Sequence, residues 1–514
     1  MKKIMSILLA ALMLISLVGC GGGKTDERTN PGQPPDGQLP DATGEWSQSL
    51  TVFTSRDQQS QWAEEKMLSR ASWMGVALGG QEQINYPELR SALETENLRF
   101  LREASSAGKT IAAAARIDNQ ELPLEEPYFR DETLSIQRAD NQVFSILRRI
   151  TEYQGGPHPD TIYEGMQWNT KTGQKLTLDD VFHSPEYLPH MLEERLLSQY
   201  PDASYFNLSD SLEQMAAENQ FCWTLGAQGI TFYFTPYSLA SFSDGLLTTT
   251  FNFAEVELFS EIYPTRESYV LPLAPEEAIH ADLITSDNQE DVLMISCVRE
   301  DYFCSEIDIV YNDILVQDFG FSLLEVRPYL VHLQQGQQER NYIYLACLQE
   351  NRRPVIYIYD LNGERPQLCG QINNSGFHTA EADNVVWKEA FHYPENFLLD
   401  TYLDILGTVT GVRSYRVDFY TGDILSSDDK YAIESDVILK TMQPIRVSIL
   451  PHMGSEQIPA GTELQFLRTD GETFVEMETD KGRKIRIDTE VTENGTTING
   501  IPAEDCISGI LYVN

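Results

Sequence analysis

Basic residues are scarce in this sequence, with 37 Lys and Arg against 78 Asp and Glu among 514 residues and a formal net charge of −41. Proteins that bind nucleic acid neutralise its phosphates with clustered Lys and Arg, and no such cluster occurs here. Nucleic acid is therefore excluded as a partner. The excess of carboxylates either attracts cationic partners or forms a solvated surface that has no partner.

Sequence signatures of catalysis are missing as well. There is no Gly-x-Ser-x-Gly motif, HExxH zinc helix, P-loop or dinucleotide-binding fingerprint. No cysteine or histidine spacing is typical of a metal site, since two prolines break any regular helix between His183 and His190. We therefore expect no enzyme activity, no cofactor and no metal. A pair of carboxylates brought together only by folding would escape this search.

Long hydrophobic runs are absent beyond residue 20, but one short run precedes it. The first twenty residues contain two lysines, about fifteen apolar residues and then Gly19 and Cys20. This segment resembles a bacterial lipoprotein signal peptide, because the run is short for a spanning helix and a small residue precedes the cysteine. We expect residues 1–19 to be removed and Cys20 to carry a lipid such as palmitate. Residues 20–44, poor in apolar side chains, are predicted to be a flexible tether on the extracytoplasmic face of a bacterial membrane.

Cysteine is also sparse in the remainder of the chain. An exported protein can form disulfides, yet six cysteines allow fifteen pairings, and free buried thiols are an equal alternative. The sequence leaves this choice open. The six residues are Cys222, Cys297, Cys304, Cys347, Cys369 and Cys506.

The spacing of apolar residues predicts an α+β module over residues 45–270, with helices packed on an antiparallel sheet. Helices are expected within 62–74 and 86–104, followed by strands at 134–139 and 143–153. Further on, the pattern predicts a hairpin turn at 169–173, a helix start at 178, a helix at 188–199 and an aromatic strand near 232–234.

From 281 to 430 the pattern is almost entirely β. Three similar units, at 292–320, 342–372 and 405–425, are about fifty residues apart, a period that suits propeller-like blades or antiparallel meanders. Three units are too few for a closed propeller. Residues 438–514 have short strands separated by Pro-Ala-Gly, Thr-Asp-Gly and Asp-Lys-Gly turns, and they resemble small SH3-like barrels of wall-associated bacterial proteins.

One loop has an unusual composition. Gly155 and Gly156 stand beside two prolines, which fixes the backbone in a way that can present His158 and nearby aromatics such as Tyr163 to a ligand. A tight structural crossover in which His158 only packs is the alternative.

Two stretches carry a family resemblance: YQGGPHPDTIYEGMQWNTKTGQKLTLDDVF at 153–182 and ITFYFTPYSLASFSDG at 230–245. They resemble the extracytoplasmic domain shared by lysozyme-binding anti-sigma-V factors and the non-catalytic part of peptidoglycan deacetylases. The common features are a Gly-Gly-x-His loop, a Thr-Gly hairpin, a Leu-Thr-Leu-x-Asp helix start and an aromatic strand that runs into Pro-Tyr. The resemblance covers about residues 150–265. It implies a cell-surface binding module whose ligand-facing candidates are Gly155, Gly156, His158, Pro236 and Tyr237.

Two departures limit this resemblance. The sequence has neither a spanning helix nor a deacetylase catalytic domain, so sigma-factor binding and deacetylation are not expected. Our hypothesis is a cell-surface lipoprotein that binds a lysozyme-like cationic protein or a peptidoglycan-related ligand. The alternatives are a structural or assembly factor of the cell wall, and an enzyme that acts on glycans or peptidoglycan.

Overall fold

The computed structural model describes residues 49–253, 259, 268–281, 291–300, 302–382, 385–492 and 495–512. The predicted signal peptide, Cys20 and the tether as far as residue 44 lie outside these ranges. The chain divides into two compact units. Unit 1 comprises Met1–Arg266 with Ala380–Ala390, and unit 2 comprises Glu267–Thr379 with Phe391–Asn514.

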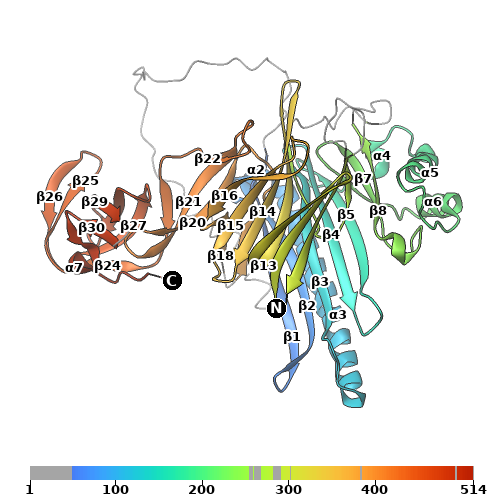
Figure 1. Ribbon diagram of the computed structural model, residues 1–514, viewed down its shortest axis with the longest axis horizontal. Helices are drawn as coiled ribbons and strands as arrows, with labels where there is room; N and C mark the ends of the chain where they lie inside the picture. The colour runs from blue at the N-terminus through green and yellow to red at the C-terminus, as the bar shows by residue number, and fades with distance from the viewer. Residues whose placement is uncertain are drawn as a thin grey trace. The chain divides into compact units, whose positions relative to one another are not determined.

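Unit 1 contains a seven-stranded sheet in the order β18-β19-β1-β2-β3-β4-β5 (Figure 1). All described pairings are antiparallel except β2 with β3, which α3 connects. The strands are β1 (Val52–Ala63), β2 (Lys66–Leu78), β3 (Tyr128–Ala139), β4 (Val143–Tyr153), β5 (Asp160–Asn169), β18 (Thr379–Ala382) and β19 (Val385–Glu389). β19 pairs with β1, so a strand from late in the chain completes a sheet that begins near residue 52.

The long helix α3 (Pro87–Glu121) follows the short α2 (Gly80–Asn85) and lies against this sheet (Figure 1). Its buried residues recur every three or four positions, as expected of a helix with one apolar face. They are Leu89, Leu93, Glu96, Phe100, Ala104, Gly108, Ile111 and Ala115. The expected helix at 86–104 is therefore confirmed and is longer than predicted.

The expected helix at 62–74 is wrong, because these residues belong to the β1–β2 hairpin. β2 is a central strand between β1 and β3, and Leu68, Ser69, Ala71 and Ser72 are all buried. These buried residues form two adjacent pairs separated by one residue. The second pair therefore lies three and four positions after Leu68, which is also the spacing along one face of a helix.

A second layer of unit 1 has its own core. Three strands in the order β6-β7-β8 pack with α5 and α6, through leucines on both helices and phenylalanines on the strands. The elements are α4 (Leu178–Val181), η2 (Pro185–Tyr187), α5 (Leu188–Gln199), α6 (Leu208–Ala217), β6 (Cys222–Leu225), β7 (Gly229–Phe234), η3 (Phe242–Asp244) and β8 (Leu247–Asn252). The predictions for 178, 188–199 and 232–234 are confirmed, and Thr177 with Asp180 forms a capping box that starts α4.

A buried ion network joins α3 to the sheet. Arg148 on β4 has a fully buried side chain that donates to Glu132 on β3 (2.8 Å), Glu103 on α3 (2.7 Å) and Glu164 on β5 (2.9 Å). Its guanidinium lies 4.3 Å from the centroid of the Phe100 ring. The charge of Arg148 is thus satisfied from three elements at once, as a buried charge requires.

Acid is expected to destabilise unit 1 through this helix. Burial raises the pKa of Glu96 and Glu103, but ion pairs with Lys175 and Arg99 for Glu96, and with Arg148 and Arg99 for Glu103, lower both below 4.5. A carboxyl whose folded pKa is depressed stabilises the fold above its unfolded pKa and loses that contribution as pH falls through the folded value. The free energy of unfolding in urea should therefore decrease as the pH is lowered below 4.5. The Glu96→Gln variant should lose less of this free energy than wild type over the same pH range. Equal losses in the two proteins would contradict the assignment.

Unit 2 is almost entirely β. Its first sheet has the order β10-β11-β12-β13-β14-β15-β16, with β9 paired to β13. The strands are β9 (Tyr269–Pro272), β10 (Ile279–Ala281), β11 (Asp291–Glu300), β12 (Phe303–Tyr311), β13 (Ile314–Gln335), β14 (Gln338–Gln349), β15 (Pro354–Asp360) and β16 (Gln367–Asn373). Alternate residues of β14 enter two different cores, with Ile343 and Leu345 in one and Tyr342 and Tyr344 in the other. The centre of this sheet is therefore covered on both faces.

The second sheet of unit 2 runs through β17-β20-β21-β23-β27-β28-β29-β25-β26, with five short strands attached. Its elements are β17 (Ser375–Phe377), β20 (Phe397–Asp404), β21 (Thr408–Val417), β22 (Ile424–Ser426), β23 (Tyr431–Glu434), β24 (Ile438–Thr441), β25 (Ile445–Ile449), β26 (Gly454–Ile458), β27 (Glu463–Thr469), β28 (Phe474–Thr479), β29 (Lys484–Thr492), β30 (Gly495–Ile498), β31 (Ile501–Pro502), α7 (Ala503–Cys506) and β32 (Ile507–Ser508). Ile405, Leu406 and Val409 share the core of the C-terminal strands. The sheet and its core thus continue across residues 430–438.

The first two repeated units are three-stranded antiparallel meanders, whereas the third is a two-stranded hairpin, and separate blades are excluded for the first two. β13 pairs with β14, which joins the units at 292–320 and 342–372 in one sheet. The third unit, at 405–425, contributes β21 and β22 to the other sheet.

Two further observations bear on the cysteines and on membranes. Cys297 and Cys304 form a disulfide between β11 and β12, whereas Cys222, Cys347, Cys369 and Cys506 are free thiols.

Among the described residues, no helix combines the length and the apolarity needed to cross a membrane.

Candidate ligand-binding site

The glycine loop connects β4 to β5. The register of this hairpin pairs Glu152 with Asp160, so residues 153–159 make the connection. Gly155 adopts a φ of +83°, and a Cβ atom at this position would lie 2.6 Å from the Tyr128 hydroxyl oxygen. Only glycine suits both the backbone and the space here. The loop is therefore held against β3, with Gly156 exposed and His158 half-buried.

A second fixed turn follows β7. Tyr237 has a φ of +70°, and its N–H donates to the Ala240 carbonyl (3.0 Å). Ser241 and Asp244 then form a capping box that starts η3. The Ser241 hydroxyl and the backbone N–H groups of Ser204 and Ser241 lower the pKa of Asp244, which is therefore ionised at neutral pH. The turn is fixed by these bonds, although it lies on the surface.

The two turns bring three rings together, and we call His158, Tyr237 and Phe242 the aromatic cluster. The His158 and Phe242 rings are stacked with centroids 3.6 Å apart, and Tyr237 lies 5.6 Å from Phe242. The Tyr237 hydroxyl is 3.4 Å from His158 Nε2. Tyr237 remains 57% exposed and Phe242 38%, so two large rings face solvent at one place.

The structure brings together some, but not all, of the ligand-facing residues expected from the sequence. His158 and Tyr237, 79 residues apart, lie within reach of each other, and Pro236 is half-buried next to Tyr237. Tyr163, in contrast, is buried and stacks on Tyr233 with centroids 6.1 Å apart, so it packs in the protein and does not join the cluster. Phe242 was missed. An aromatic residue within the serine-rich stretch SLASFSDG was the available signal.

The chemistry open to the cluster is contact with planar, apolar or cationic groups. Arg and Lys side chains bind over the faces of aromatic rings, most strongly when water is excluded. Asp160 follows His158, and Asp244 follows Phe242, by two residues in the sequence. In the part of the chain that the structure describes, no group of three or more His, Cys, Asp or Glu residues is placed to hold a metal ion.

Comparison with known proteins gives limited similarity. No protein-family model matches the chain, and no curated protein matches it. A crystal structure of a member of the DUF3298 family from Bacteroides fragilis is 13% identical, with a TM-score of 0.31, over 41% of this chain and 94% of that chain. A DUF3298 family protein from Pseudomonas aeruginosa is 15% identical, with a TM-score of 0.30, over 43% of this chain and 99% of that chain. The similarity is partial and distant.

Proposed function

We propose that this protein is a lipid-anchored surface protein that binds a cationic protein such as lysozyme through the aromatic cluster of unit 1. The lipidated Cys20 would hold it on the extracytoplasmic face of a bacterial membrane. Residues 150–265 would then be a member of the domain shared by lysozyme-binding anti-sigma-V factors and peptidoglycan deacetylases. The C-terminal residues 438–514, as an SH3-like module, would provide a further interaction surface.

The observation that carries the proposal is the juxtaposition of His158 and Tyr237. Each was a ligand-facing candidate in a separate stretch of sequence, and their rings meet at the surface together with Phe242. A cation held over an exposed ring contributes roughly 0.5–1 kcal/mol, and more once water is excluded. The formal charge of −41 supports the same class of partner, since it accelerates encounters with a basic protein.

The first test is a calorimetric titration of the chain from residue 20 onward, carrying Cys20→Ser, with lysozyme. We expect saturable binding at about 20 mM salt that weakens at about 500 mM, because the Debye length falls well below about 10 Å across this range. Binding that is insensitive to salt would contradict electrostatic recruitment. Absence of binding at both salt concentrations would overturn lysozyme as the ligand.

The second test removes a ring of the cluster. Tyr237→Ala should weaken lysozyme binding at least tenfold, or about 1.4 kcal/mol, while the melting temperature stays that of wild type. Tyr187→Ala is the matched control, because Tyr187 in η2 is 63% exposed and takes no part in the cluster. Equal affinities for wild type and Tyr237→Ala would remove this residue from the site.

A further inference from the structure

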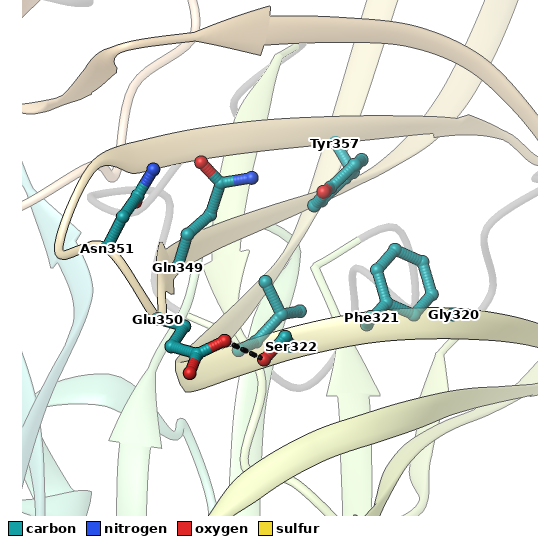
Figure 2. A pocket seen from close by; sticks show the side chains of 8 residues that line it. Gly320, Phe321, Ser322, Gln349, Glu350, Asn351 and Tyr357 are labelled. Carbon is teal, nitrogen blue, oxygen red and sulfur yellow. Dashed lines mark hydrogen bonds between the residues drawn. The ribbon is translucent and has the colours of Figure 1, made fainter.

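Unit 2 contains a pocket of about 400 Å³, called the cavity below, that is open to solvent and is lined in part by the exposed Ser322, Glu350 and Asn351. It lies where the β14–β15 hairpin faces a bulged part of β13, at Gly320, which has a φ of +87° (Figure 2). Small-molecule sites commonly have volumes of roughly 300–1,000 Å³, so the cavity is large enough for a ligand of one or two rings. Six of the residues that line it have polar or aromatic side chains: Phe321, Ser322, Gln349, Glu350, Asn351 and Tyr357.

The walls of this cavity are fixed to each other. The Glu350 backbone N–H donates to the Ser322 carbonyl (3.0 Å), and the Ser322 hydroxyl donates to Glu350 Oε2 (3.1 Å). Within the hairpin, the Gln349 N–H donates to the Arg353 carbonyl (3.0 Å). These bonds hold the hairpin against β13, so a ligand would meet a largely pre-formed site, which lowers the entropy lost on binding.

The side chains divide into an aromatic end and an amide end. The Phe321 and Tyr357 rings meet edge to face with centroids 5.2 Å apart. Gln349 and Asn351 project from the hairpin in the same direction, and the dashed bond between Ser322 and Glu350 lies below them (Figure 2). An amide both donates and accepts hydrogen bonds, as does a hydroxyl, whereas ring faces and edges pack against C–H groups.

We infer that this cavity binds one or two sugar rings of a short neutral oligosaccharide. A sugar presents hydroxyl groups that donate and accept at its rim and C–H groups on its faces, which matches the amide end and the aromatic end. Glu350, the one charged side chain among the lining residues, accepts a bond from Ser322 but keeps its charge, so a cation is the competing ligand that the variant Glu350→Gln tests. The amide end is partly bonded already, since Asn351 Oδ1 accepts from the Arg353 N–H (2.9 Å) and Gln349 bonds to the Tyr357 hydroxyl. The Asn351 N–H groups and the remaining Gln349 positions are those that the hydroxyl groups of a sugar would meet.

The experiment titrates the chain from residue 20 onward, carrying Cys20→Ser, with chitotriose, cellotriose and maltotriose. We expect saturable binding of at least one trisaccharide and at least a tenfold loss of affinity in both Gln349→Leu and Phe321→Leu. Phe319→Leu is the matched control, since Phe319 lies on the same strand, is 67% exposed and does not line the cavity. Unchanged melting temperatures of all three variants ensure that the comparison concerns folded protein.

Glu350→Gln together with n-butylammonium as a probe tests the class of ligand. A neutral sugar should bind Glu350→Gln within threefold of wild type. The inference is overturned if no trisaccharide binds, if Gln349→Leu and Phe321→Leu both bind like wild type, or if n-butylammonium alone binds and is lost in Glu350→Gln. The result is independent of the lysozyme titration, because the cavity and the aromatic cluster belong to different compact units.

Discussion

Replacing Gly165 by alanine is expected to destabilise unit 1 by more than about 3 kcal/mol, because it forces two strands apart. Gly165 lies in β5 where β6 crosses it, and a Cβ atom there would be 1.8 Å from the Trp223 carbonyl oxygen. This neighbour is backbone and cannot turn aside as a flexible side chain can. The Gln167 amide also donates to that carbonyl, so the crossing is bonded as well as close.

Urea unfolding followed by tryptophan fluorescence measures this effect. Gly226→Ala is the control within the same unit, because its Cβ would meet nothing nearer than the Gly229 carbonyl oxygen at 3.6 Å. It should lie within about 1 kcal/mol of wild type. A Gly165→Ala protein as stable as Gly226→Ala would mean that β6 does not cross β5 at this distance.

Arg148→Met is the second variant with a large expected effect, a loss of about 3–5 kcal/mol. The change leaves the Glu132 carboxylate, which is 1% exposed, without two of its hydrogen bonds and with only Arg130 as a partner. It also removes the link from β4 to Glu103 on α3. The loss thus arises from an undercompensated buried charge more than from the absent arginine.

A double variant separates these two causes. Arg148→Met with Glu132→Gln removes both charges, and the amide oxygen still accepts from Arg130, so at least half of the lost free energy should return. Arg90→Met is the control for a partly exposed pair, with Glu94 3.6 Å away on the same helix, and should change stability by no more than about 0.5 kcal/mol. If the double variant is no more stable than Arg148→Met, the unpaired carboxylate is not the cause.

Local patterns predicted the elements whose burial has a single period. Helix α5 occupies Leu188–Gln199, as expected, because its buried leucines at 188, 192 and 196 mark one face. The prediction for β2 was wrong because this strand is covered by β1, β3 and α3. These neighbours bury its polar residues, including Ser69 and Ser72, as well as its apolar ones. A buried serine carries no hydrophobic signal, so the alternation of a strand is hidden in the sequence.

The candidate site was predictable only where local sequence patterns identify its residues. The resemblance at 153–182 and 230–245 selected both His158 and Tyr237, and local turn chemistry explains how each is held. Phe242 and the burial of Tyr163 depend on how β5 and β7 pack, which no local pattern encodes. The cavity of unit 2 was not predicted at all, because it depends on a β13–β14 register that brings Ser322 to Glu350 across a bulge.

The pairing of β19 with β1 also determines the order in which the protein can be completed during synthesis. The sheet of unit 1 lacks its β19 neighbour until residue 389 has left the ribosome, by which time β9 to β17 of unit 2 have already emerged. Through this interval the Phe53–Ser55 segment of β1 presents unpaired backbone groups, a template for pairing with another chain. A gene fragment that stops near residue 270 would therefore encode a unit 1 whose β1 edge lacks this strand.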